Sequence, residues 1–129
     1  MSGPPSAEFS PQAASLAAVR SFVRDSCPGL DDLDLLRVII VVNELATNAV
    51  EHAQSAYSVK LITLGDSAVR IEVEDAEDAL PRLAEEPSTE NGRGLRIVEG
   101  IARAWGSEPR EAAGKVVWAE LDTPSLERR

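Results

Sequence analysis

The residues with the clearest potential for chemistry lie in the segment NELATNAVEHA, residues 43–53. Glu44 and Asn48 are four positions apart, so on a helix they share one face. A carboxylate and an amide on a largely buried helix are costly unless a partner satisfies them. A Mg²⁺–phosphate ligand would do so, since Asn offers a neutral oxygen to a hard cation and Glu can accept a proton or orient water. The alternative interpretation is a solvated polar stripe where the helix reaches the surface.

Two further candidates follow along the chain. Asp75 ends an alternating segment, where its carboxylate could accept a hydrogen bond from an exocyclic amine; a turn-initiating Asp is the alternative. Gly92-Arg93-Gly94 precedes a helical pattern, where glycines and the helix dipole favour a phosphate; a simple hinge is the alternative. The spacing does not match the dinucleotide-binding fingerprint, because the third glycine is replaced by Ile97.

The elements that would position these residues can be read from apolar periodicity. The β-branched run 38–42 also fits a strand, but helical spacing continues through residues 44–49 and favours a helix whose first half is buried all round. Trp105-Gly106 is expected to close the last helix. The predicted elements are helices over 12–26, over 31–53 and from after Gly94 through Ala102, and strands over 57–63, 69–75, 107–109 and 115–121.

This order predicts an α+β fold, a two-layer sandwich in which helices cover one face of a mixed, mostly antiparallel sheet. We expect a flexible lead-in over residues 1–11, one domain over 12–121 and a loose tail over 122–129. The 129 residues are enough to bury a core.

The net charge, the cysteine count and the apolar runs limit the classes of protein to which the chain can belong. The net charge of −9, with scattered Arg and Lys, argues against direct nucleic-acid or anionic-membrane binding. The single cysteine, Cys27, allows no internal disulfide. Because no signal peptide or membrane-length apolar run is visible, a cytoplasmic location is expected.

The order of the motifs resembles the GHKL (Bergerat-fold) ATPases. The sequence is most similar to the anti-sigma-factor serine/threonine kinase branch, especially its short actinobacterial members. The matching segments are VVNELATNAVEHA (41–53), IEVEDAEDALP (71–81), GRGLRIVEGIARAWG (92–106) and GKVVWAEL (114–121).

This resemblance implies ATP and Mg²⁺ as cofactors and a role for each candidate residue. Glu44 would be the general base, Asn48 would chelate Mg²⁺, and Asp75 would hydrogen-bond the adenine amine. Gly92 and Gly94 would offer backbone N–H groups to the phosphates, with Arg93 as a charge partner or, alternatively, a solvent-facing side chain. The partners implied are a sigma factor and an anti-sigma-factor antagonist, and the amphipathic first helix could form a homodimer.

The sequence also departs from the family pattern. Glu77 and Ala79 stand where glycines usually follow the adenine-binding Asp, and Gly114-Lys115 replaces a Gly-Thr near the last strand. Two functions therefore remain open: a kinase that phosphorylates the antagonist and sequesters the sigma factor, and a partner-binding switch that transfers no phosphate. A two-component histidine kinase module fits less well, because the chain has no room for a phosphoacceptor helix pair.

Overall fold

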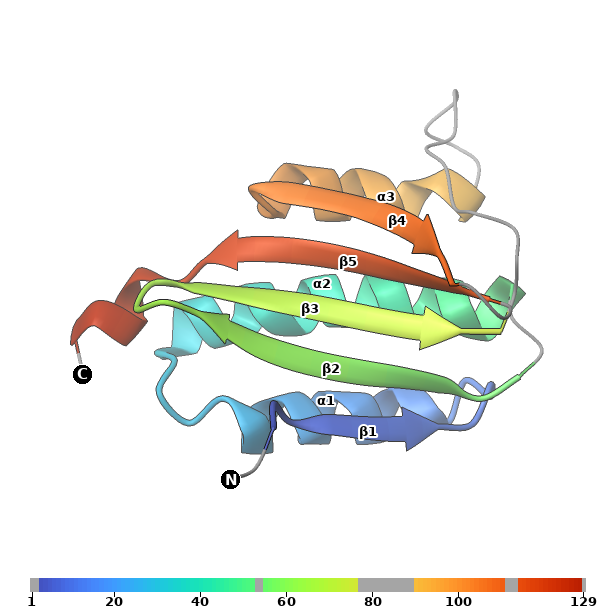
Figure 1. Cartoon of the computed structure of the whole chain (residues 1–129), viewed down its shortest axis with the longest axis horizontal. Helices are drawn as coiled ribbons and strands as arrows, with labels where there is room; N and C mark the ends of the chain where they lie inside the picture. The colour runs from blue at the N-terminus through green and yellow to red at the C-terminus, as the bar shows by residue number, and fades with distance from the viewer. Residues whose placement is uncertain (1–2, 53–54, 77–89, 111–113, 129) are drawn as a thin grey trace.

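The computed structural model describes residues 3–52, 55–76, 90–110 and 114–128. Within these ranges, three helices and five strands follow one another along the chain (Figure 1). No described helix combines the length and apolar character needed to cross a lipid bilayer. The elements are β1 (Ser6–Phe9), α1 (Ser15–Ser26), α2 (Asp32–His52), β2 (Tyr57–Leu64), β3 (Ala68–Asp75), α3 (Glu90–Ile101), β4 (Ala104–Pro109), β5 (Lys115–Asp122) and the 3₁₀ helix η1 (Pro124–Arg128).

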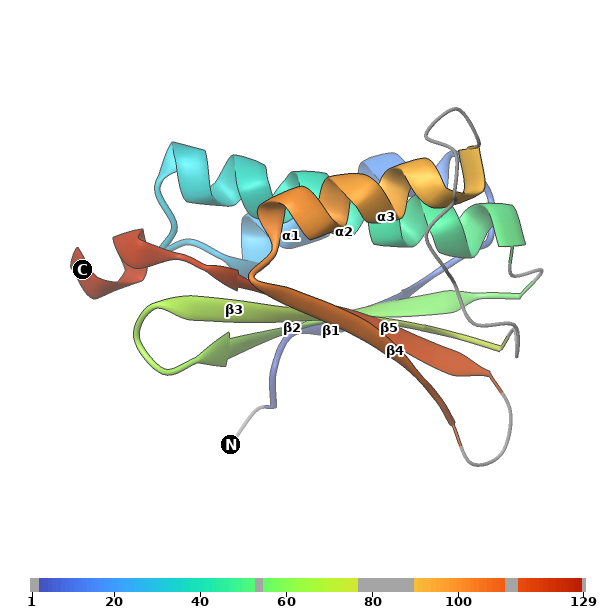
Figure 2. The same ribbon diagram turned by 90° about the horizontal axis from the view of Figure 1, so that it is seen from above.

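The elements form two layers, with the helices on one face of the sheet (Figure 2). The strand order is β1-β2-β3-β5-β4, and every described pairing is antiparallel. Gly65 has a φ of 59° and turns the β2–β3 hairpin, a conformation that glycine adopts at no steric cost. The predicted two-layer sandwich is confirmed, and the described sheet is antiparallel rather than mixed.

Helix α2 lies across the middle of the sheet, and α1 and α3 flank it (Figure 2). Its N-terminus is capped by Asp31, whose Oδ1 accepts a hydrogen bond from the Asp34 N–H at 2.9 Å. The helix predicted over the β-branched run is confirmed. One apolar stripe is buried against the sheet: Val38, Val41, Val42, Leu45, Ala46 and Ala49.

The first half of α2 is not buried all round, contrary to the prediction. Leu33 and Leu36 are 65% and 53% exposed. An apolar composition does not by itself imply complete burial, because the helix layer has an outer side that no described element covers.

The first and last segments are more ordered than the sequence indicated. Residues 6–9, within the expected flexible lead-in, form β1 and pair with β2. Phe9 of this strand stacks on Tyr57, with ring centroids 5.8 Å apart, and packs edge-on against Phe22. Four residues between prolines give too short a pattern to show a strand, so tertiary packing decides the structure here.

The expected loose tail is instead fastened to the start of α2. The Asp34 carboxylate accepts hydrogen bonds from both the N–H and the Oγ of Ser125, at 2.9 and 2.6 Å. The same Ser125 Oγ accepts a hydrogen bond from the Asp31 N–H at 3.1 Å. Arg37 donates to the Asp122 carbonyl at 2.7 Å. The prediction of a loose tail is therefore wrong for residues 122–126, because these polar contacts and the packing of Leu126 against the core hold them.

The boundaries of α3 also differ from the prediction. The helix begins at Glu90, so Gly92-Arg93-Gly94 belong to its first turns rather than preceding it. It ends at Ile101, and Trp105-Gly106 lie in β4 instead of closing the helix. Thr89, directly before Glu90, is of a residue type that favours N-caps, a signal in the sequence that a boundary based on the glycines overlooks.

The sheet face opposite the helices carries a charged layer. Arg70 donates to Glu72 and Glu120 at 2.9 and 2.8 Å and lies over the Trp118 ring, 4.4 Å from its centroid. Gly106 allows this indole to lie flat against β4, since a Cβ there would be 2.9 Å from the ring. The pattern is typical of an antiparallel sheet with one solvated face.

We predict that Ser125→Ala lowers the free energy of unfolding by about 2 kcal/mol, since it removes two hydrogen bonds, one of them to a buried carboxylate. Urea unfolding measures the change. Ser10→Ala, at an exposed site, is the control and should have almost no effect.

The effect should also depend on pH. Burial raises the pKa of the Asp34 carboxyl, but hydrogen bonds from Ser125 and the charge of Arg37 outweigh it and leave the pKa lowered. The stability that ionised Asp34 contributes is present above the ordinary carboxyl pKa and is lost as the pH falls through the lowered value. A Ser125→Ala effect that stayed constant below about pH 3 would contradict this account.

Candidate functional site

Three elements that carry the candidate residues end at the same side of the domain. The carboxyl end of β3, the last turns of α2 and the first turn of α3 lie together there, in both views (Figures 1 and 2). Asp75 is the last residue of β3, and Glu44 and Asn48 lie in the second half of α2. The topology therefore brings the separate sequence motifs to one region.

Helices α2 and α3 run antiparallel, which determines what Glu44 and Asn48 face (Figure 1). Arg37 and Asn48 lie on the same stripe of α2, about three helical turns apart. Arg37 approaches the Ile101 carbonyl at the end of α3, with a distance of 3.5 Å. Because the partner helix runs back, Asn48 lies on the side of α2 that faces the start of α3.

Glu44 and Asn48 are both half-buried. Among the described residues, neither side chain hydrogen-bonds to another side chain or to the backbone. Burial raises the pKa of the Glu44 carboxyl, and the neighbouring charge of Glu51 raises it further. A half-desolvated carboxylate of raised pKa is a suitable proton acceptor, and the adjacent amide oxygen is a suitable ligand for a hard cation.

The first turn of α3 supplies backbone N–H groups. Counted from the residue before the helix, the first four N–H groups have no partner inside it, and here they include that of Gly92 but not that of Gly94, the fifth helical residue. With the helix dipole they favour an anion, so a phosphate interaction remains physically reasonable at Gly92, whereas the helix start at Glu90 places the Gly94 N–H inside the helix. The Arg93 side chain, like Glu77 and Ala79, lies outside the described residues.

Asp75 has a partner that the sequence did not indicate. Its Oδ1 lies 3.1 Å from the Lys115 Nζ, and both side chains are 2% exposed. The two residues are cross-strand partners at the ends of β3 and β5. By strand alternation they share the helix-facing side with the core pairs Val73–Val117 and Ile71–Ala119. A buried ion pair therefore lies at the end of the β3–β5 ladder, at the position where the base-binding carboxylate was predicted.

Gly114 makes the close approach of these strands possible. Its φ is 90°, which L-residues with side chains rarely adopt. A Cβ at this position would lie 2.1 Å from the Asp75 carbonyl oxygen. The glycine before Lys115 is therefore required for the backbone at this end of the sheet, independently of any ligand.

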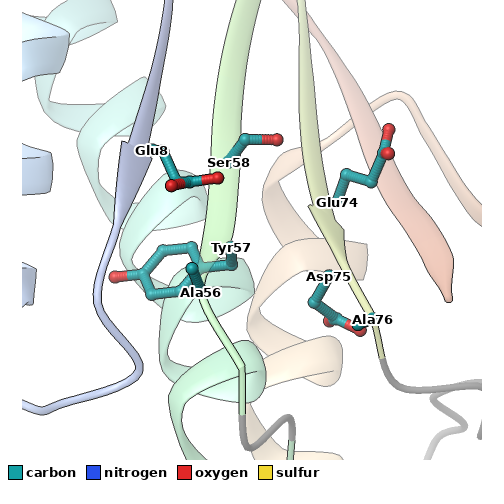
Figure 3. A pocket seen from close by; sticks show the side chains of 7 residues that line it. All are labelled: Glu8, Ala56, Tyr57, Ser58, Glu74, Asp75 and Ala76. Carbon is teal, nitrogen blue, oxygen red and sulfur yellow. The ribbon is translucent and has the colours of Figure 1, made fainter.

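A separate open pocket of about 230 Å³ adjoins Asp75 between β1, β2 and β3 (Figure 3). Two further carboxylates, Glu8 and Glu74, line it, and so does Tyr57, whose hydroxyl hydrogen-bonds to Ser15 Oγ at 2.6 Å. Glu44 and Asn48 do not line it. Its negative charge makes it unsuitable for a triphosphate, so we distinguish this pocket from the predicted nucleotide site.

Sequence reasoning identified the position of Lys115 only as a departure from the family pattern. One signal could have revealed its partner. Asp75 ends one alternating strand and Lys115 begins another. Both occupy positions that alternate with the exposed residues of their strand and match its buried ones. When oppositely charged residues occupy core-facing positions at strand ends, they indicate a buried ion pair if the two strands are neighbours.

We predict that Glu44→Gln raises the melting temperature at pH 7, because it removes a half-buried negative charge beside Glu51. The stability contributed by protonated Glu44 is fully present below the ordinary glutamate pKa, about 4.3, and is lost as the pH rises through the raised value. The gain of the variant should therefore vanish in acid. Glu99→Gln, on the exposed side of α3, is the control, and an equal gain in both variants would contradict the prediction.

Comparison with known proteins supports the fold. Among solved structures, the histidine kinase domain of a blue-light activated histidine kinase from Erythrobacter litoralis is similar, with a TM-score of 0.53 and 20% identity. The match covers 89% of this chain but only 62% of that one, and at this identity it shows the fold alone. None of the curated proteins matches. A model of the histidine kinase-like ATPase domain matches residues 9–121, and the chain therefore belongs to that family.

Proposed function

We propose that the domain binds Mg²⁺-ATP and transfers the γ-phosphoryl group to a serine or threonine of a partner protein. One observation carries the proposal: a half-buried carboxylate and amide on α2, with no hydrogen-bonding partner among the described residues, face the open N–H groups at the start of α3. Membership of the histidine kinase-like ATPase family supports the same assignment.

The polar groups of this region fit the components of Mg²⁺-ATP. Asn48 would hold the Mg²⁺ through its amide oxygen, and the first turn of α3 would bind phosphate oxygens. Asp75 would accept a hydrogen bond from the adenine amine. When bound, the Mg²⁺ would neutralise charge on the phosphates.

Glu44 would act on the acceptor hydroxyl. As the hydroxyl oxygen forms a bond to the γ-phosphorus, the bond from that phosphorus to the β–γ bridging oxygen breaks, and ADP leaves. The hydroxyl proton passes to the Glu44 carboxylate, whose pKa is raised by burial and by Glu51. Positioning of the two substrates supplies most of the remaining acceleration.

The resemblance to anti-sigma-factor kinases supports a partner class. The acceptor would be an anti-sigma-factor antagonist, and the domain would also sequester a sigma factor in the cytoplasm and so regulate transcription. A homodimer through the first helix is part of the same proposal.

The Asp75–Lys115 ion pair favours a second candidate, a partner-binding switch without phosphotransfer. The predicted base acceptor already has an internal cationic partner, and a ligand must reach a pair that is almost completely buried. The two candidates make different predictions for phosphate transfer, although both allow nucleotide binding.

We predict that calorimetric titration with Mg²⁺-ATP gives a binding signal that Asp75→Asn weakens about 10- to 100-fold, since a charged hydrogen bond to the base becomes neutral. The asparagine retains an oxygen for Lys115. Asp66→Asn, in the exposed turn at the other end of the β2–β3 hairpin, is the matched control. Absence of heat with the wild type at millimolar nucleotide would contradict ATP binding.

We further predict that Glu44→Gln retains ATP binding but lowers the rate of phosphotransfer about 10²- to 10⁴-fold. Asn48→Ala should lower both Mg²⁺-dependent binding and transfer. Incorporation of labelled phosphate into a co-purified antagonist measures the rate. Because Glu44→Gln is expected to stabilise the domain, a loss of activity could not result from unfolding. Undiminished transfer by Glu44→Gln would exclude this residue as the base, and no transfer by the wild type would favour the switch.

A further inference from the structure

We propose that the outer surface of α1 and α2 binds the partner protein, and that the partner contributes an acidic amphipathic helix. The α1–α2 surface, as we call it, consists of Arg20 and Arg24 on α1 and of Leu33, Leu36 and Ile40 on α2. The inference rests on the proposed function, in which the domain acts on a partner protein, and it names where that partner binds.

The apolar part of the surface is a stripe on the outer side of α2. Leu33 and Leu36 are exposed and Ile40 is half-buried, and their spacing of three and four residues places them on one face of the helix. This face points away from the sheet (Figure 2). Partner helices bind through anchors at the same spacing, so the stripe fits a helix that lies alongside it.

The basic part of the surface lies on α1, beside the stripe. Arg20 and Arg24 are four positions apart and share one face of this helix. Arg20 Nη1 donates to Asn43 Oδ1 on α2 at 3.1 Å, so this face of α1 borders α2. Because the two helices run antiparallel (Figure 1), Arg24 lies beside the turn of α2 that carries Ile40. The two arginines therefore form a basic border along the apolar stripe.

Arg20 and Arg24 have no acidic partner among the described residues, in contrast to arginines elsewhere in the fold. The contrast is informative because the chain has 22 acidic residues and only 13 lysines and arginines. The described arginines that do pair with carboxylates are Arg37, Arg70, Arg103 and Arg110. A guanidinium group has several N–H donors, and the described contact of Arg20 uses one of them for a neutral amide.

The charge of the surface indicates the kind of partner. The remaining donors of the two arginines suit carboxylates, which bind guanidinium groups in a matching planar geometry. The net charge of −9 opposes a polyanion such as nucleic acid or an anionic membrane. A protein helix with carboxylates on one flank and apolar residues beside them satisfies both parts of the surface.

The position of the surface connects it with the proposed reaction. Glu44 lies about one helical turn after Ile40 on α2. A helix that follows the stripe in this direction leads toward that carboxylate. Docking here would therefore help to position a hydroxyl of the same partner beside the proposed base.

The test uses two synthetic peptides as probes. Both have about 20 residues, enough to form a helix, and carry leucines at the spacing of the stripe. One has glutamates along one flank, and the other has lysines at the same positions. Fluorescence anisotropy measures the affinity of the whole chain for each labelled peptide.

We expect wild type to bind the acidic peptide about five- to tenfold more tightly than the basic peptide at low salt. Arg24→Glu, at an exposed site, should remove or reverse this preference, since it replaces attraction by repulsion. Leu36→Ser should weaken binding of both peptides about tenfold. Lys60→Glu is the matched control: it makes the same change in net charge at an exposed site on β2 and should keep the wild-type preference.

Three results with the peptides would overturn the inference. They are no binding of either peptide to wild type, a preference that persists in Arg24→Glu, and undiminished binding by Leu36→Ser. Two other occupants are tested directly, and either finding would also overturn it. A wild-type dimer in sedimentation that Leu36→Ser dissociates would assign the surface to a second copy. Binding to phosphatidylserine vesicles that Arg24→Glu abolishes would assign it to a membrane.

Failure of this inference can be distinguished from failure of the proposed function. A chain that binds Mg²⁺-ATP and transfers phosphate but does not bind the acidic peptide contradicts only the docking surface. A chain that binds the acidic peptide as expected but not Mg²⁺-ATP contradicts only the proposed kinase reaction.

Discussion

Burial of the apolar stripe of α2 against the sheet is the interaction on which the rest of the structure depends. This helix contacts both other helices and strands β2, β3 and β5. The stripe is rich in valine, whose branched side chain loses little further freedom when it packs on the pleated surface. The same helix carries Glu44 and Asn48 on its flank, so the residues that form the core also hold the candidate catalytic groups in place.

The two buried carboxylates of the described residues lie at opposite ends of the domain. At one end, Asp34 and Ser125 fasten the last turn to the start of α2. At the other, Asp75 and Lys115 close the sheet beside the second half of the same helix. Removing one partner of either carboxylate would weaken the interactions that stabilise a buried charge, so both ends are sensitive to single substitutions.

The sequence predicted most of the fold because α1, α2 and the β2–β3 hairpin have clear apolar periodicity. It could not predict β1, which is four residues long and is stabilised by contacts of Phe9 with distant aromatic rings. The tail was assigned wrongly because hydrogen bonds to Asp34, far away in the chain, determine its structure. Exposure of Leu33 and Leu36 depends on which side of a helix layer remains uncovered, which periodicity alone does not specify.

The candidate site was predictable only in part, for a related reason. Spacing on one helix placed Glu44 and Asn48 on one face. The resemblance to the GHKL ATPases assigned roles to Asp75 and to residues 92–94. The pairing of Asp75 with Lys115 requires β3 and β5 to be neighbours in a given register, and forty positions of chain separate the two residues. Local patterns contain no information about such a contact until the topology is known.

The short strand β1 has a consequence for the solubility of the domain. Strand β2 alternates buried Tyr57, Val59 and Leu61 along eight residues, and without β1 part of its backbone would form an open edge able to pair with another chain. The opposite edge, β4, ends with Glu108 and Pro109, a charge and a residue without an N–H donor. One edge is thus covered by a strand of only four residues, and the other ends in a charged residue and a proline. Both features protect the sheet against edge-to-edge aggregation.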